Sequence, residues 1–427
     1  MRRSLYEVKA SILKASVTPF TLRKCMGRNS TFSRVCYVYE NTNFLGFNTL
    51  EMETQPIRFQ ALDVFRGMAI VLMIIVNSPG SWDHVYAPLL HAEWHGFTLA
   101  DLVFPSFLFA IGTAMSFSMR KWAGQPGGEV IKKILKRTTL LFLFGYLMHW
   151  FPFYKLDAEL NFSSFPIGET RIFGVLQRIA LAYGITALLL HFMGKKWTYG
   201  LVLISLPVYW ILLINYGIEG LEPLSLEGNA VRALDLKLIG ADHMYTVKDI
   251  AFDPEGMLST LPSMANIVAG YAAGIFIQGE RNEKNKRIDL MLLGGLLSLM
   301  ALVWNLALPI NKQLWTSSFA VLTIGLDLCI IGYLMARMRR RKKPTRLRKF
   351  YASAGKNPLA IYLFSELAFI TLSNIPIGGQ RLWEFMYSNG FLWMGEKFGS
   401  LIMAMVFMLL CWLFGYWLNS KKWYWKV

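Results

Sequence analysis

Residues 58–119 read RFQALDVFRGMAIVLMIIVNSPG (58–80), SWDHVYAPLLHAEWHG (81–96) and FTLADLVFPSFLFAIGTAMSFSM (97–119). The two apolar runs, Ala61–Pro79 and Thr98–Met119, have the roughly 20 residues that an α-helix needs to cross the hydrocarbon core of a bilayer. The polar segment between them is therefore expected at a membrane surface. It carries histidines at positions 84, 91 and 95. A segment that only connects two helices does not need three titratable side chains of this kind, so a functional site is expected here.

The rest of the chain repeats this pattern. Hydrophobic residues make up 54% of the 427 residues, and the long apolar runs are too many for one or two soluble domains. Long continuous apolar segments predict helices, because a helix satisfies its own backbone hydrogen bonds. We therefore expect an all-α polytopic membrane protein, a bundle of about ten transmembrane helices. The predicted spans are Ala61–Pro79, Thr98–Met119, Lys133–Phe151, Arg171–Met193, Tyr199–Tyr216, Met257–Gln278, Asp289–Leu308, Leu314–Met335, Ser353–Asn374 and Phe398–Asn419.

Basic residues predict the orientation of these spans. The formal net charge is +17, but the bases gather on alternate connectors, which is typical of the positive-inside rule and not of a nucleic-acid-binding patch. The base-rich connectors and both termini are expected in the cytoplasm, so the segment with His91 faces outward. The base-rich set includes Arg120, Lys121, Lys132, Lys133, Lys136, Arg137, Lys195, Lys196, Arg281, Lys284, Lys286, Arg287, the run Arg337–Lys349, Lys421, Lys422 and Lys426; the other set holds only Lys155, Arg232, Lys237, Lys248, Lys312, Arg381 and Lys397.

Residues 1–51 contain no predicted span and are basic with few acids. We interpret them as an N-terminal extension, disordered or upstream of a start at Met52, and residues 52–427 as one multi-pass transmembrane domain. An organelle transit peptide is the alternative interpretation.

Ionisable residues at membrane depth are costly, so each is a candidate functional residue. Arg178 lies about two turns into the fourth predicted span, and a guanidinium suits a phosphate or carboxylate because it binds either one in a bidentate manner. Asp327 and Glu366 lie within later spans, where an interhelical pair that only fixes packing is the alternative. Asp63 and Arg66 lie near the start of the first span.

Further candidates lie on the predicted outward connectors. The turn Pro309–Phe319 presents Asn311 and Lys312 just before a span, and Lys312 is expected to meet a phosphate or carboxylate unless it only snorkels to the interface. A long acidic connector ends in Asp253 and Glu255 at a predicted helix N-terminus, where the helix dipole favours carboxylates.

His91 is the predicted reactive group. Imidazole has an unperturbed pKa near neutrality, so His91 could accept a proton from an amine or hydroxyl nucleophile. Asn77 is close enough in sequence to orient a thioester or stabilise an oxyanion. No metal is expected, because the histidines lack the spacing of paired ligands.

Several segments resemble, in the same order, the heparan-alpha-glucosaminide N-acetyltransferase family and its bacterial relatives. They are LDVFRGMAIVLMIIVN (62–77) followed by HAEWHGFTLADLVFP (91–105), then RIFGVLQRIA (171–180), FDPEGMLSTLPSMAN (252–266), PINKQLWTSSF (309–319) and GKNPLAIYLFSE (355–366). The resemblance implies a polytopic membrane enzyme that takes acetyl groups from cytoplasmic acetyl-CoA. It delivers them to the amine of a terminal glucosamine on the far side.

The resemblance also implies roles for individual residues. The family's catalytic histidine falls on His91, as base or acetyl carrier, and its partnering asparagine falls on Asn77. His95 stands where the eukaryotic enzyme has an asparagine. The expected contacts of acetyl-CoA are Arg178, Lys312, Asn311, Asp63 and Arg66, and those of the amino-sugar acceptor are Asp101, Asp253, Glu255 and Glu366.

Two other functions share these sequence features. A transporter or permease for a small anionic or sugar solute would have the same spans without an acyl donor, and an O-acyltransferase of envelope polysaccharide would differ only in its acceptor. The sequence has no counterpart of the eukaryotic enzyme's large lumenal domain and preceding span, so a small or lipid-linked amino sugar is expected as the acceptor. We expect a location in a bacterial cytoplasmic membrane, no nucleic-acid partner, and leave a homodimer open.

Overall fold

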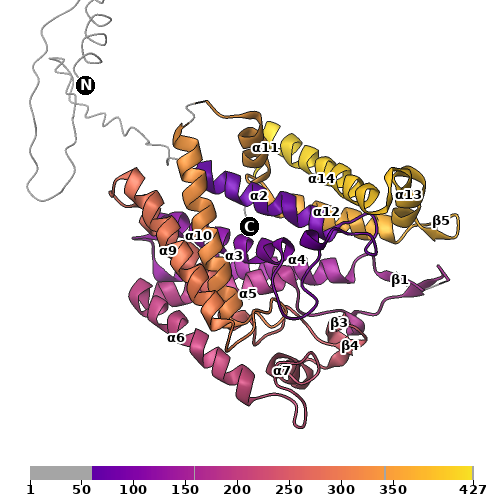
Figure 1. The fold of residues 1–427 in the computed structure, drawn as a ribbon, viewed down its shortest axis with the longest axis horizontal. Coiled ribbons are helices and arrows are strands. Elements are labelled where there is room, and N and C mark those ends of the chain that lie inside the picture. The colour runs from indigo at the N-terminus through magenta and orange to yellow at the C-terminus, as the bar shows by residue number, and fades with distance from the viewer. Residues whose placement is uncertain (1–59, 158, 341–342, 426–427) are drawn as a thin grey trace, which may run out of the picture. The chain divides into compact units, whose positions relative to one another are not determined.

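The computed structural model describes residues 60–157, 159–340 and 343–425 (Figure 1). The domain boundary predicted between residues 51 and 52 lies outside them. The α-helices are α2 (Gln60–Asn77), α3 (Leu99–Trp122), α4 (Gly127–Trp150), α5 (Val175–Phe192), α6 (Gly194–Asn215), α7 (Ala230–Leu238), α8 (Thr260–Gln278), α9 (Glu283–Trp304), α10 (Ser317–Arg340), α11 (Arg346–Ala354), α12 (Pro358–Ser373), α13 (Leu382–Gly390) and α14 (Glu396–Ser420).

Short elements occupy the connectors. The 3-10 turns are η1 (Ala87–Leu89), η2 (Ile167–Glu169), η3 (Ala241–His243) and η4 (Leu392–Met394). Three antiparallel hairpins pair β1 (Tyr154–Leu156) with β2 (Phe162–Ser164), β3 (Thr246–Val247) with β4 (Ile250–Ala251), and β5 (Pro376–Ile377) with β6 (Gln380–Arg381).

Eight helices among the described residues are long and apolar enough to cross a membrane, namely α2, α3, α5, α6, α8, α9, α10 and α14. The prediction of an all-α polytopic membrane protein is therefore confirmed. The other two predicted spans are also helical but differ from a standard span. The helix α12 has only 16 residues, and α4 carries Lys133, Lys136 and Arg137 in its first half.

Glycines bring the central helices into close contact. A Cβ added at Gly112 of α3 would overlap Ile267 O of α8, and one at Gly270 of α8 would overlap Phe109 O of α3. Small residues at such crossings let helix backbones approach within a membrane, where packing contacts drive association. The pair α3–α8 therefore forms the centre of the bundle, and α9 packs along α10 in the same manner.

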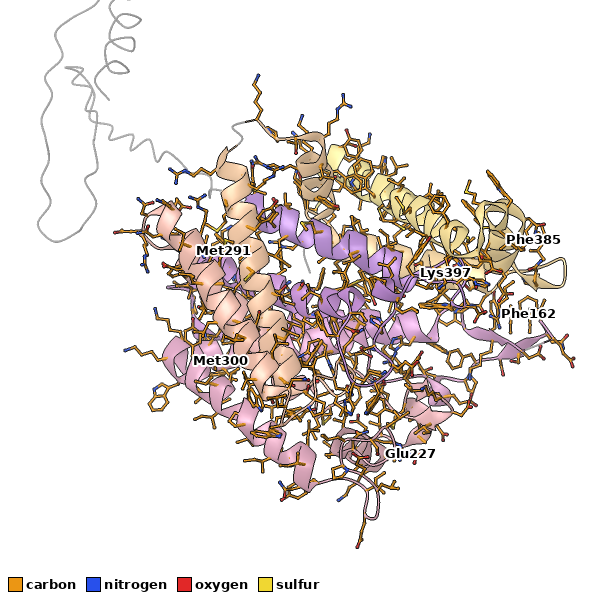
Figure 2. The ribbon with its side chains drawn as sticks, viewed as in Figure 1. Phe162, Glu227, Met291, Met300, Phe385 and Lys397 are labelled. Carbon is orange, nitrogen blue, oxygen red and sulfur yellow. The ribbon has the colours of Figure 1, made fainter. Side chains whose placement is uncertain are left out.

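The outer helices expose apolar side chains. Only 17% of the apolar window of α9 is buried inside the protein, compared with 72% for α10. Met291 and Met300 project from α9 at the flank of the bundle (Figure 2). Exposed apolar surface of this extent suits contact with lipid and not with water.

The end of α2 and the starts of α3, α5, α8 and α10 lie at one end of the bundle, which we call the polar end. Backbone hydrogen bonds join the connectors at this end, from Gly96 N–H to Ile310 O at 2.8 Å and from Ile172 N–H to His243 O at 3.1 Å. The connector between α6 and α8 folds as α7 and the β3–β4 hairpin next to the end of α6 (Figure 1). The charged side chains predicted on separate connectors are thereby brought together.

Candidate active site

His91 is held by Asp101 at the polar end. The His91 ring donates from Nδ1 to Asp101 Oδ1 at 2.8 Å. Asp101 is fully buried in the first turn of α3, where its second oxygen accepts from Thr98 N–H at 2.9 Å and from Ala92 N–H at 3.2 Å. Because a carboxylate only accepts, it places the proton on Nδ1 and leaves Nε2 as the basic nitrogen. Asp101, expected to contact the acceptor, thus has the contacts of a residue that positions His91.

Lys312 lies over the same imidazole. Its Nζ is 3.0 Å from both ring nitrogens of His91 and 3.8 Å from Asp101 Oδ1. With Nδ1 protonated, Nε2 is the ring nitrogen that accepts a hydrogen bond from the ammonium, and this bond must break before Nε2 takes a proton from another molecule. Burial, with a smaller contribution from Lys312, lowers the pKa of His91, although Asp101 acts in the opposite direction. The lowered pKa favours the neutral form of His91, which is the form that can act as a base.

Replacing Lys312 with methionine is expected to raise the pKa of His91, because the change removes a neighbouring positive charge. A higher pKa keeps His91 protonated up to a higher pH. The acid limb of the pH profile of kcat/KM should therefore move to higher pH. Lys248→Met is the matched control, since Lys248 is exposed and pairs with Glu93 at 3.8 Å. An unmoved limb in Lys312→Met would show that Lys312 does not tune His91.

Arg171 joins the two carboxylates that precede α8. Its guanidinium donates to Asp253 at 2.9 and 2.7 Å and to Glu255 Oε2 at 2.6 Å. Burial pushes the pKa of Glu255 upward, but the charges of Arg171, Arg178 and Lys312 hold it below its ordinary value. Glu255 is thus an ionised carboxylate between three cations, and its charge also acts on His91.

Arg178 is fully buried and contacts the segment that follows Glu255. Its Nη2 donates to Gly256 O at 3.2 Å and to Ser259 Oγ, and its guanidinium faces the Trp315 ring at 5.0 Å. Its Nε and Nη1 atoms have no hydrogen-bond partner among the described residues. Two unpaired cationic donors inside the protein suit an oxygen of a bound ligand.

Asn77 and Glu366 form a separate pair. Asn77 Nδ2 donates to Glu366 Oε1 at 3.2 Å, and no hydrogen bond between Asn77 and His91 occurs in the described part of the chain. The predicted catalytic pair His91 and Asn77 is therefore brought to one end of the bundle but not into direct contact.

The remaining candidates lie elsewhere. Asn311 is fully buried and holds its own turn, because its Oδ1 accepts from Leu314 N–H at 2.8 Å; its Nδ2 lies 3.4 Å from His95 Nδ1. Asp63 and Arg66 lie near the start of α2, about 21 Å along the helix axis from Asn77 for Asp63. The residues expected to contact acetyl-CoA are thus split between the two ends of the bundle.

The sequence analysis missed Arg171 and Asp235 as site residues. Arg171 had a usable signal, since it is a base at the predicted outward end of a span, where the positive-inside rule does not call for one. Asp235 had no signal in the sequence that set it apart, because it is one of many acidic residues on a long connector. The fold buries it completely and lets its Oδ1 accept from Met257 N–H at 3.1 Å.

Asp235 is expected to make stability depend on pH. Burial, with a contribution from Asp253, raises the pKa of Asp235 to about 7. A raised folded-state pKa means that this contribution to stability is complete below the unfolded pKa near 4 and is lost as pH rises through about 7. The thermal midpoint of the wild type should fall between about pH 4 and 7, and Asp235→Asn should flatten that fall. The control is Asp242→Asn at an exposed site of the same connector; equal slopes in wild type and Asp235→Asn would contradict the prediction.

In the part of the chain that the structure describes, no three His, Cys, Asp or Glu residues are grouped to hold a metal ion.

Comparison with known proteins identifies the relatives of this chain. Residues 58–239 match the family model described as "Heparan-alpha-glucosaminide N-acetyltransferase, catalytic". The heparan-alpha-glucosaminide N-acetyltransferase of Mus musculus is 28% identical over 316 residues, which cover 61% of this chain and 46% of the relative. The enzyme of the same name from Homo sapiens is 26% identical over 374 residues, which cover 75% of this chain and 54% of the relative. The chain spans about half the length of these curated relatives.

Proposed function

We propose that the chain is a member of the heparan-alpha-glucosaminide N-acetyltransferase family, which its matches support, and that it transfers the acetyl group of acetyl-CoA to the amine of an amino sugar. The observation that carries the proposal is the His91–Asp101 pair, with Nδ1 bound at 2.8 Å and Nε2 left basic. A neutral imidazole fixed by a buried carboxylate is the arrangement that general-base acyl transfer uses.

The proposed reaction moves one proton and one acyl group. Nε2 of His91 takes a proton from the acceptor amine as the amine nitrogen forms a bond to the thioester carbon. The carbon–sulfur bond then breaks, and His91 returns the proton to the departing thiolate. A second route, in which Nε2 first accepts the acetyl group and then passes it to the amine, uses the same atom.

Other side chains of the cluster have roles that follow from their charge. The unpaired donors of Arg178 and the ammonium of Lys312 are placed to stabilise negative charge on the thioester oxygen. The carboxylate of Glu255 is suited to bind the acceptor in its ammonium form, which releases one proton to solvent before the neutral amine gives its next proton to His91. These groups support an amine acceptor in particular, since a hydroxyl acceptor carries no positive charge for Glu255 to bind.

We place the donor in the cytoplasm and the acceptor on the opposite side of a bacterial cytoplasmic membrane. The support is the distribution of bases, which makes the polar end the predicted outward end. Asp63 and Arg66 then lie toward the cytoplasmic end, where the polar part of acetyl-CoA would enter.

The test is the transfer of labelled acetyl from acetyl-CoA to glucosamine by purified protein in proteoliposomes. Labelled N-acetylglucosamine that survives hydroxylamine is expected, because hydroxylamine cleaves acetyl esters and leaves acetamides intact. A hydroxylamine-sensitive product would indicate an O-acyltransferase. Uptake of glucosamine without acetylation, and without binding of acetyl-CoA, would indicate a transporter and refute the proposal.

A further inference from the structure

A second group of polar side chains lies between α4 and α5. This α4–α5 polar cluster consists of His149 and Gln177, which both lie against Gly174, and we include Thr170, which directly precedes Arg171 in the chain. The Gln177 side chain is fully buried, and neither its Oε1 nor its Nε2 has a hydrogen-bond partner among the described residues. The Thr170 hydroxyl is also fully buried and has no hydrogen-bond partner among the described residues. Each unpaired buried group costs about 1–3 kcal/mol, so a bound partner for them is expected.

Glycines create the space for this cluster. A Cβ at Gly145 of α4 would overlap the Gln177 amide, and a Cβ at Gly174 would overlap the His149 ring. Any other residue at either position would therefore displace a polar group of the cluster. His149 donates from Nδ1 to Arg171 O at 3.2 Å, which leaves its Nε2 as an acceptor.

The chemistry of the cluster points to neutral hydroxyl groups. Gln177 offers both a donor and an acceptor, Thr170 offers both in one hydroxyl, and His149 offers an acceptor. None of the three carries a permanent charge, so an ion is not the matching ligand. A hydroxyl, which both donates and accepts, satisfies such a set.

The cluster adjoins the candidate active site. Arg171 accepts a hydrogen bond from His149 on its carbonyl and binds Glu255 through its guanidinium at 2.6 Å. The charge of Glu255 acts on both His149 and His91. Arg171 thus connects Glu255 to the α4–α5 polar cluster, and an amine bound to Glu255 would have its ring close to that cluster.

We propose that the α4–α5 polar cluster binds ring hydroxyls of the acceptor, so that the protein selects a polyhydroxylated amine over a simple amine. This inference rests on the proposed function, because it takes the acceptor amine to lie between Glu255 and His91. The cluster then determines specificity, while His91 carries out the chemistry.

The experiment compares glucosamine with cyclohexylamine, which has the ring and the amine but no hydroxyls. In Gln177→Leu the KM for glucosamine should rise about tenfold or more, because the variant leaves sugar hydroxyls unpaired. The kcat/KM for cyclohexylamine should change little. Thr170→Val removes one hydroxyl at nearly constant volume. It should also raise the KM for glucosamine and leave kcat/KM for cyclohexylamine nearly unchanged. Gln380→Leu, at a half-buried glutamine on β6, is the matched control.

A binding measurement separates this inference from the proposed function. Calorimetric titration of glucosamine into the protein without acetyl-CoA should show weaker binding in Gln177→Leu than in the wild type. Weaker binding in a protein that transfers no acetyl would support the cluster and refute the acetyltransferase. Normal transfer with unchanged glucosamine KM and Kd in both folded variants would overturn the inference and leave the function standing. Equal loss with both amines would also overturn it, since a purely structural role affects both acceptors alike.

Discussion

Replacing His91 with alanine is expected to reduce kcat/KM for acetyl transfer to glucosamine by about 100- to 10,000-fold. The variant removes Nε2, the nitrogen left basic because Asp101 accepts a hydrogen bond from Nδ1. The carboxylate of Asp101 retains its bonds to Thr98 N–H and Ala92 N–H, so the start of α3 should stay folded. Initial rates of labelled acetyl transfer, with a thermal unfolding curve for each protein, measure the effect.

His84→Ala is the matched control, because His84 lies in the same polar segment but does not belong to the group of charged residues around His91. Its Nδ1 is 3.5 Å from Glu396 Oε2, and its ring stacks on Tyr387 with the ring centroids 6.4 Å apart. Transfer by His84→Ala should stay close to the wild-type rate. Wild-type transfer by a folded His91→Ala protein would rule out both the base and the acetyl-carrier roles.

Replacing Arg171 with alanine is expected to lower the free energy of unfolding by roughly 3–5 kcal/mol. The change would leave Asp253 and Glu255, whose side chains are only 0% and 13% exposed, without the cation that binds both. Uncompensated buried carboxylates are costly because desolvation is no longer offset by a partner. The thermal midpoint in detergent should fall sharply, and Arg171→Lys should restore only part of it, because an ammonium cannot bind in the bidentate geometry.

Lys155→Ala provides the comparison with an exposed ion pair. Lys155 is 2.9 Å from Glu169, but the two side chains are 47% and 54% exposed. Solvent screens such a pair, so its loss should cost about 0–1 kcal/mol. Similar losses in Arg171→Ala and Lys155→Ala would mean that the Arg171 pairs are not effectively buried.

The apolar runs were sufficient to predict the membrane class and nearly all the main helices. Segment length decides this outcome, since a span needs about 20 apolar residues wherever it lies in the chain. The prediction of a span was weaker for two helices. The helix α4 carries charged residues in its first half, and α12 is shorter than a standard span. The ordered segments also pointed to the family whose catalytic model matches residues 58–239.

The sequence by itself indicated which residues are candidates for chemistry, because an ionisable side chain at membrane depth is costly without a function. Only the tertiary structure decided their partners. Lys312 is 221 residues from His91 and touches its ring, whereas Asn77 is only 14 residues from His91 and bonds to Glu366. Sequence separation does not report such contacts, because antiparallel spans bring distant helix ends to the same surface. Helix packing therefore determines which groups share a proton or a charge.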